Sequence, residues 1–324
     1  MPVPVSFARR ATPRRSSRLK RVATPDAALP DRDARSGVNG ECRPDTRRTV
    51  AAPALRDASS GVLIVAHDED TGALRAAMAA EGFAVDDVRG PYTPQQLAYS
   101  RVMQALVNHA NAWRIAAGRD RPTIVVEPDF VPVKGFGDLP APVPPGKADW
   151  SLAYLYAVGP EVWDLATTNV ARGRGGGAVA LLIPPKVASL LLQFFAEELE
   201  TNAAGAYRPW DSGMGYWLLQ RGVESYLPYR HFGEHGGVGN PEHARFGPGR
   251  AHRADALQGP LAFVPVYARG STLRLRRTRL RARIWGVLRL GCGRFLSLGD
   301  LARSHPSDMI RFAVGRLLFR TPPS

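Results

Sequence analysis

Residues 123–133 read TIVVEPDFVPV: a run rich in β-branched side chains, then Glu127 and Asp129 on either side of a proline, then a second apolar stretch. A β-branched apolar run bounded by proline predicts a short buried strand. Both carboxylates then stand at the carboxyl end of that strand, which is the edge where open α/β sheets bind ligands. Two hard oxygen ligands this close can hold a divalent cation. We therefore expect Glu127 and Asp129 to bind Mn²⁺ or Mg²⁺.

The residues before this strand predict alternating strands and helices. The run GVLIVA at 61–66 is typical of a buried strand, and a helix is expected over 71–81, where Gly82 ends it. Residues 83–85 predict a second strand, and residues 100–117 carry apolar side chains at helical spacing behind Ser100 as an N-cap. Such an order opens an α/β nucleotide-binding half. The sequence therefore predicts an α/β fold with a mostly parallel central sheet flanked by helices.

The pattern continues after the acidic strand. Strands are expected over 150–158 and 178–183, helices over 185–200 and 212–221, and a final strand over 222–228. The sequence RGRGGG at 172–177 lacks the Gly-Lys-Ser/Thr ending of a phosphate-binding P-loop. We expect this glycine-rich stretch to form a mobile lid.

The order of these motifs is similar to that of a known family. A serine-led helix carries Asn108-His109 and Trp113, a basic turn follows at 119–121, and the next strand ends in acids. Further on come IPPKVA at 183–188 and RPWD at 208–211. Over about residues 61–245 the chain resembles glycosyltransferase family 25, the lipopolysaccharide-biosynthesis glycosyltransferases. There the acidic strand ends in Glu-Asp-Asp, whereas this chain has Pro128 in place of the middle acid.

The resemblance implies a GT-A-like domain over 61–245 that moves a hexose from a UDP-linked nucleotide sugar to a hydroxyl of a lipopolysaccharide-type, lipid-linked or other glycan. Asp211 matches the position of a general base, although an acid at the start of a helix can also be a simple N-cap. The nucleotide would be bound at the ends of the first strands and on the serine-led helix, by His67, Asp68, Arg89, Tyr92, Asn108 and His109. The competing hypothesis, favoured by the missing middle acid, is a catalytically degenerate module that binds anionic glycan or a membrane surface.

A second histidine-containing motif, HFGEH at 231–235, formally matches the H-x-x-E-H pattern of some zinc peptidases. That chemistry needs both histidines on one long helix, and Pro228, Gly233 and the Gly236-Gly237 pair exclude such a helix. We expect instead a loop that closes over the site and supplies Glu234 as a second catalytic residue. An ordinary surface loop is the alternative.

The composition restricts partners and location. The net charge of +14 indicates an anionic partner. The sequence has no run of about 18 apolar residues, the length that a membrane-spanning helix needs. The two cysteines, Cys42 and Cys292, are too few and too far apart in the sequence for a disulfide scaffold. A cytoplasmic protein is expected, held peripherally on the inner face of the cytoplasmic membrane.

Both flanks of the central region are basic. Residues 1–60 are rich in Arg, Ala, Pro and Ser without periodicity, which predicts a disordered basic arm. Residues 246–324 predict a basic tail with amphipathic helices, because nine arginines and no acid lie between 269 and 294, interleaved with Leu, Ile and Trp. An anionic membrane surface is the expected partner. Nucleic acid is not, because no recognition motif accompanies the charge. A basic helix packed on the core is the remaining alternative.

Overall fold

The computed structural model describes residues 52–239, 252–291 and 306–319. The chain divides into two compact units, Met1–Arg48 and Thr49–Ser324, and the first lies wholly outside the described residues. Most of the predicted disordered arm therefore lies outside them too. At its end, Leu55–Ala58 form the short helix α1, in which Leu55 is fully buried. Helical structure is thus present before the predicted boundary at residue 60.

Within the described residues, six strands form the central sheet, in the order β2-β1-β3-β6-β5-β7. β1 is parallel to β2 and β3, β5 is parallel to β7, and β6 is antiparallel to β3, β5 and β7. Five strands therefore run in one direction and β6 runs in the other, which confirms the expected mostly parallel sheet. The strands are β1 (Val62–Val65), β2 (Val85–Val88), β3 (Thr123–Val126), β5 (Ser151–Thr167), β6 (Val170–Ile183) and β7 (Glu224–Pro228).

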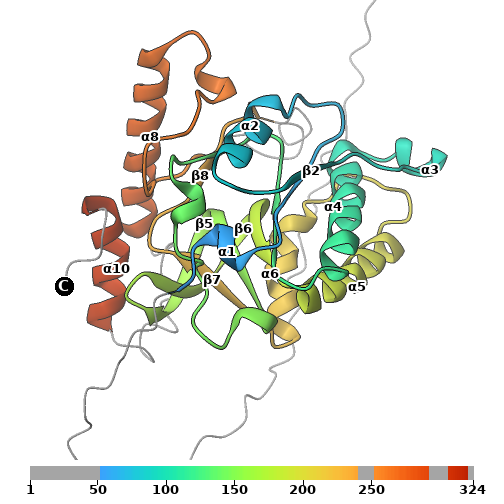
Figure 1. Cartoon of the computed structure of the whole chain (residues 1–324), viewed down its shortest axis with the longest axis horizontal. Coiled ribbons are helices and arrows are strands. Elements are labelled where there is room, and N and C mark those ends of the chain that lie inside the picture. The colour runs from blue at the N-terminus through green and yellow to red at the C-terminus, as the bar shows by residue number, and fades with distance from the viewer. Residues whose placement is uncertain (1–51, 240–251, 292–305, 320–324) are drawn as a thin grey trace, which may run out of the picture. The chain divides into compact units, whose positions relative to one another are not determined.

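Helices cover the sheet because its inner strands are apolar on both faces. Side chains of successive strand residues point to opposite faces. Leu63 and Val65 accordingly pack in one hydrophobic cluster with helices α4, α5 and α6, while Val62 and Ile64 pack in another with α1 and α2. Figure 1 shows α4 and α5 side by side. The helices are α2 (Gly72–Ala80), α3 (Pro94–Leu97), α4 (Arg101–Ala117), α5 (Pro185–Thr201), α6 (Trp210–Gln220), α8 (Thr272–Gly291) and α10 (Pro306–Leu318), with short 3₁₀ turns η1 (Phe136–Asp138), η2 (Ala148–Trp150) and η3 (Val266–Ala268).

The predicted start of the serine-led helix is confirmed. The Ser100 hydroxyl accepts a hydrogen bond of 3.3 Å from the backbone N–H of Met103, as an N-cap does. This fixes the helix that carries Asn108 and His109 against the first strands.

The predicted glycine-rich lid is wrong, because residues 172–177 belong to β6. A Cβ atom on Gly173 would lie 2.2 Å from the Glu161 carbonyl oxygen, and one on Gly175 would lie 2.4 Å from the Ala157 Cβ. These glycines let β6 approach β5 closely, which is a recognised use of glycine inside a strand. They are required for packing rather than for motion.

A further strand follows the one expected to be last. β4 (Phe130–Pro132) and β8 (Gly233–His235) form a separate antiparallel pair, in which Phe130 faces His235 and Val131 faces Glu234. The expected loop at 231–235 is therefore wrong over 233–235. The pairing ties the chain just after Asp129 to a segment about one hundred residues further on.

Helices α8 and α10 belong to the same compact unit as the sheet. Met309, Phe312 and Ala313 of α10 form a small hydrophobic cluster with Val162 and Ala171 of the β5–β6 hairpin and with Tyr229. α8 packs against α10 (Figure 1) and against η3. Among the described residues, no helix combines the length and the apolar character that crossing a bilayer requires.

Candidate metal centre

The acidic pair lies on a tight turn at the carboxyl end of β3. The Glu127 backbone N–H donates to the Val179 carbonyl of β6 at 2.8 Å, which holds this end of the strand. The Phe130 N–H then donates to the Glu127 carbonyl at 3.1 Å, closing a β-turn with Pro128 at its second position. Proline favours that position because its ring sets the required backbone angle. Pro128 thus shapes the turn from which both carboxylates project.

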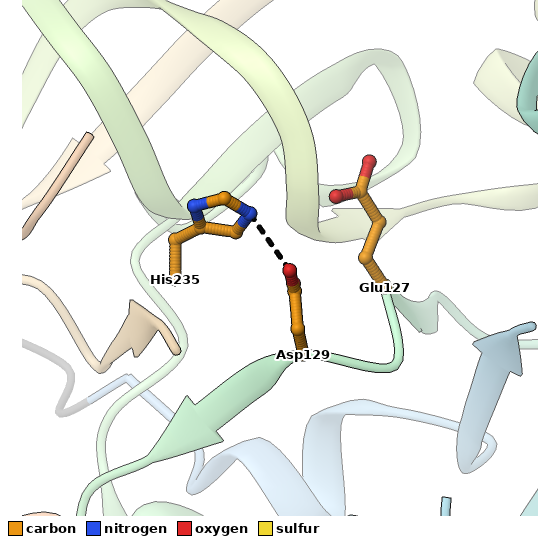
Figure 2. A group of neighbouring side chains, drawn as sticks. All are labelled: Glu127, Asp129 and His235. Atoms are coloured by element: carbon orange, nitrogen blue, oxygen red, sulfur yellow. Dashed lines mark ion pairs between the residues drawn. The ribbon is translucent and has the colours of Figure 1, made fainter. Parts of the chain in front are cut away.

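Pairing of β4 with β8 brings His235 to the same place. The Gly236 N–H donates to the Asp129 carbonyl at 2.7 Å, and the His235 Nε2 lies 2.8 Å from the Asp129 Oδ2. Figure 2 shows the imidazole and the Asp129 carboxylate directed toward each other, with Glu127 beside them. One ligand atom from each of the three residues lies within 4.8 Å of the others.

The electrostatics of this cluster suit a cation. The Asp129 Oδ1 is buried and has no hydrogen-bond partner among the described residues. Burial lowers the pKa of His235, but the charges of Asp129 and Glu127 outweigh burial and raise it above its ordinary value. The two carboxylates thus favour positive charge at the imidazole. A bound divalent ion would take the place of that proton, since metal ligands must be deprotonated.

Two glycines make room for the cluster. A Cβ on Gly237 would lie 2.1 Å from the Asp129 Oδ2, and one on Gly236 would lie 2.9 Å from the Asp129 carbonyl oxygen. Arg253 holds the same segment by donating to the His235 and Gly237 carbonyls. The backbone around Asp129 is therefore fixed from both strands.

Replacing Gly237 with alanine is expected to weaken Mn²⁺ binding about 10–100-fold, as the loss of a supporting group around a metal ligand does. The new methyl group must displace the Asp129 carboxylate. Isothermal titration with Mn²⁺ measures the effect. Gly213→Ala is the matched control, because beyond its own helix no atom lies within 4 Å of its Cβ position on α6. Equal Mn²⁺ affinity of the two variants would contradict the assignment.

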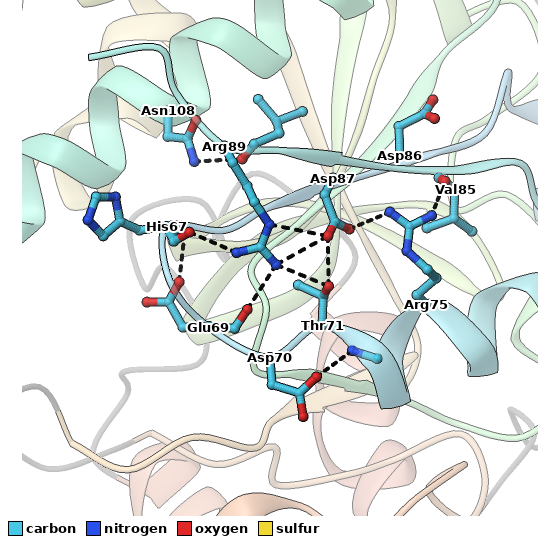
Figure 3. Close-up of polar contacts among 12 residues, drawn as sticks. His67, Glu69, Asp70, Thr71, Arg75, Val85, Asp86, Asp87, Arg89 and Asn108 are labelled. Atoms are coloured by element: carbon cyan, nitrogen blue, oxygen red, sulfur yellow. Dashed lines mark hydrogen bonds and ion pairs between the residues drawn. The ribbon is translucent and has the colours of Figure 1, made fainter. Parts of the chain in front are cut away.

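The predicted nucleotide-binding residues that follow the first strands lie at the same sheet edge, where Figure 3 shows His67, Arg89 and Asn108. His67 and Asp68 follow β1, Arg89 and Tyr92 follow β2, and β1 lies between β2 and β3. The rings of His67 and Tyr92 meet edge to face with centroids 5.1 Å apart, and the Asp68 side chain is 89% exposed. His67, Asp68 and Tyr92 are thus available to a ligand.

Arg89 and Asn108 instead build the loops of this edge. Arg89 donates to the carbonyls of His67 and Glu69 and to the Asp87 carboxylate (Figure 3). The Asn108 amide donates to the carbonyls of Ala66 and Val88 at 2.6 and 2.7 Å and accepts from the Gly90 N–H. Both amide hydrogens are thereby used. These two residues position the ends of β1 and β2.

His109 lies next to Glu127 of the acidic pair. It is fully buried, and its Nε2 is 3.5 Å from the Glu127 Oε1, longer than a good hydrogen bond. Its ring packs against Trp113 and Trp210, with centroids 5.8 and 5.2 Å away. The structure therefore places His109 as a support for Glu127, away from solvent.

The two predicted catalytic acids differ in their surroundings. Asp211 is partly exposed in the first turn of α6, directly after Trp210, and its Oδ1 accepts from the neighbouring Ser212 N–H. The helix N-cap is Pro209, so the alternative of Asp211 as N-cap is wrong. Glu234 is fully buried in β8 and is ion-paired with Arg279 at 2.8 Å. Burial raises the pKa of Glu234, although Arg279 opposes this.

The sequence did not identify His235 as a partner of the acidic pair. Its only signal was the HFGEH motif, whose metal-peptidase interpretation depended on a helix that the structure replaces with a strand. Neither a family model nor a curated protein matched the chain. The resemblance to glycosyltransferase family 25 thus stays a prediction.

Proposed function

We propose that this protein is a metal-dependent glycosyltransferase that moves a hexose from a UDP-linked sugar to a hydroxyl of a lipopolysaccharide-type or other glycan. The main support is the cluster of Glu127, Asp129 and His235 at the carboxyl edge of a mostly parallel sheet. Open α/β sheets bind ligands at that edge. The exposed groups after β1 lie next to the cluster in strand order, so a nucleotide bound to them would lie beside the cation.

Glu127, Asp129 and His235 would hold Mn²⁺ or Mg²⁺. Carboxylates suit both ions, and the imidazole favours Mn²⁺, since Mg²⁺ prefers an all-oxygen shell. When bound, the cation neutralises the charge that develops on the departing nucleoside diphosphate. His67, Asp68 and Tyr92 would bind the base and ribose, while Arg89 and Asn108 keep their loops in place.

Asp211 is the proposed general base for the acceptor hydroxyl. It follows Trp210, whose ring contacts His109, and the His109 Nε2 lies 3.5 Å from the Glu127 Oε1. These contacts link the start of α6 to Glu127. We assign no step to Glu234, because its carboxylate is buried and paired with Arg279.

The direct test measures Mn²⁺ binding and hydrolysis of UDP-sugars by the purified full chain. An active transferase should release UDP slowly without acceptor, and only when Mn²⁺ or Mg²⁺ is present. Binding of Mn²⁺ and UDP without any turnover, across a panel of UDP-hexoses and glycan acceptors, would favour the degenerate module. Failure to bind either ligand would defeat the proposal.

Replacing Asp211 with asparagine is expected to preserve UDP binding and to reduce transfer roughly 10²–10⁴-fold, the range typical of removing a general base. The amide keeps the size of the side chain but cannot take up the proton. Steady-state transfer assays with saturating Mn²⁺ measure the loss. Asp308→Asn is the matched control, because Asp308 occupies the first turn of α10. Equal transfer by both variants would remove Asp211 from the mechanism.

A further inference from the structure

Helix α8 is unusual in its composition and exposure. Its twenty residues, Thr272–Gly291, include seven arginines and no acid. Several large apolar side chains on it are exposed to solvent, notably Leu273 (64%), Leu280 (61%), Val287 (54%) and Ile284 (51%). A helix that only packed on the core would turn such side chains inward.

One face of α8 is occupied by the rest of the protein. Ala282 is buried, and a Cβ on Gly286 would lie 2.5 Å from the Asp255 Cβ, so α8 approaches Asp255 closely there. Arg279 donates to the Glu234 carboxylate and to the Ala254 carbonyl. At 3.6 residues per turn these three positions share one side of the helix.

The opposite face is apolar, with arginines along its borders. Counting 100° per residue from Ala282, the four exposed apolar side chains fall between 140° and 200°, directly away from the protein. The bordering arginines lie at about 120° and between about 220° and 280°. These bordering residues are Arg274, Arg276, Arg277 and Arg281. Their side chains have no hydrogen-bond or ion-pair partner among the described residues.

Helix α10 adds a second exposed apolar row. Ile310, Val314 and Leu318 recur every four residues, and each is exposed. α10 contacts α8, and Figure 1 shows the two helices neighbouring each other, away from α4 and α5. The exposed apolar surface of this part of the molecule is thus not confined to one helix.

We propose that the outward face of α8 binds the surface of an anionic phospholipid bilayer. An apolar stripe bordered by arginines is the pattern of a helix that lies in the membrane interface. The apolar side chains enter the boundary of the acyl chains, and the arginines extend to the headgroups. Each basic residue near such a surface adds to the attraction.

Two other partners fit this face less well. Nucleic acid binding depends on phosphate contacts and would leave the four apolar side chains without a role. A second copy of the chain would bring arginine-rich faces together, and like charges in an interface oppose association. A bilayer offers partners both for the apolar side chains and for the arginines of the helix.

This surface also explains how a membrane-anchored acceptor could be reached, a point that rests on the proposed function. Arg279 on the inward side of α8 binds Glu234, which directly precedes His235 of the metal cluster. Helix α8 therefore lies between the bilayer-facing surface and Glu234 of β8. A hydroxyl on a lipid-linked glycan would lie near the active site.

Sedimentation with vesicles of phosphatidylcholine alone, and with phosphatidylglycerol added, tests the proposal on the full chain. Binding is expected only with phosphatidylglycerol and should fall as salt rises. Replacing Arg276 and Arg277 together with glutamine should weaken binding about 25-fold, or about fivefold for each charge. Ile284→Ser should weaken it about tenfold through lost apolar contact.

Matched controls are exposed residues that lie outside α8 and α10. Lys134→Gln with Arg114→Gln, and Leu97→Ser, should leave binding unchanged. Because Ile284, Arg276 and Arg277 are exposed, their variants should keep the wild-type melting temperature. Equal effects of test and control variants would overturn the proposal, as would equal binding to neutral vesicles.

Two further outcomes would also overturn it. One is salt-sensitive binding to an oligonucleotide but not to vesicles. The other is a dimer in sedimentation equilibrium that Ile284→Ser dissociates. The Asp129→Asn variant should bind vesicles like the wild type, so loss of membrane binding and loss of catalysis can be told apart.

Discussion

Asp129→Asn is expected to reduce Mn²⁺-dependent turnover of a UDP-sugar by roughly 10²–10⁴-fold. A bound cation contributes several kcal/mol of charge stabilisation in such reactions, and each 1.36 kcal/mol corresponds to a factor of ten. Asparagine keeps the shape of the side chain but removes one of the two anionic ligands. Its Nδ2 or Oδ1 would also face His235, whose raised pKa depends on the Asp129 charge.

The fold should tolerate this change. The Asp129 side chain is 29% exposed, and its ion pair with His235 is partly solvated. Unfolding in urea should therefore give a free energy within about 1 kcal/mol of the wild type. Asp149→Asn, at an acid that is 82% exposed and paired with Lys186, is the control and should change neither quantity. Full activity of Asp129→Asn would exclude Asp129 and Glu127 as ligands of a catalytic metal ion.

The strands of the sheet interior could be predicted because burial on both faces makes them continuously apolar. Val62–Val65 and Thr123–Val126 are buried at every position. Such runs stand out from their polar surroundings, and the acids after them are then placed at one edge by parallel pairing alone. The shared location of Glu127, Asp129 and His67 needed no knowledge of side-chain contacts.

The long hairpin of β5 and β6 could not be predicted in the same way. Its outer half is glycine-rich and charged, features typical of a loop. The register pairs Glu161 with Arg174 and Asp164 with Arg172, so these charges are satisfied across the strands. Cross-strand pairs of opposite charge stabilise a sheet, but they are recognised only when the register is known.

His235 was missed for a related reason. Its approach to Asp129 depends on the pairing of two three-residue strands, β4 and β8, that are distant in the sequence. A shift of one residue would turn His235 to the other face of that small sheet. The glycines at 236 and 237 are the one local sign, since they permit the close approach, but their use becomes clear only beside Asp129.

The C-terminal segment was expected to be a separate basic tail, yet its arginines also enter the protein interior. Arg316 of α10 is 1% exposed, and its Nη2 donates to the Asp255 Oδ1 at 2.7 Å. Its backbone carbonyl accepts from Arg230. His231 Nε2 lies 3.1 Å from the Asp255 Oδ1 and 3.0 Å from the Arg316 Nη2. This nitrogen can either donate to Asp255 or accept from Arg316, so it hydrogen-bonds to only one of them at a time.

Asp255→Ala is accordingly expected to destabilise the protein by about 3–5 kcal/mol, because it leaves the Arg316 guanidinium buried without its counter-charge. Chemical denaturation followed by circular dichroism measures the loss. The double variant Asp255→Leu with Arg316→Met should recover most of it, since apolar residues can replace a buried ion pair. Glu197→Gln is the control: its pair with Arg221 is exposed, and its loss should cost less than about 1 kcal/mol.

The same pair should make the fold sensitive to acid. Burial alone would raise the pKa of Asp255, but the Arg316 charge and the His231 hydrogen bond outweigh it and hold the pKa well below its ordinary value. A carboxyl with a lowered folded pKa contributes stability above its unfolded pKa, about 4, and that stability is lost as the pH falls further. His231 adds to this acid sensitivity, because burial lowers its pKa below the ordinary value. His231 of the unfolded chain therefore binds a proton from about pH 6.5 downward, and this proton binding destabilises the fold. The wild type should therefore lose stability below pH 4 more steeply than the double variant, and parallel pH profiles would show that the Asp255–Arg316 pair does not hold α10 in place.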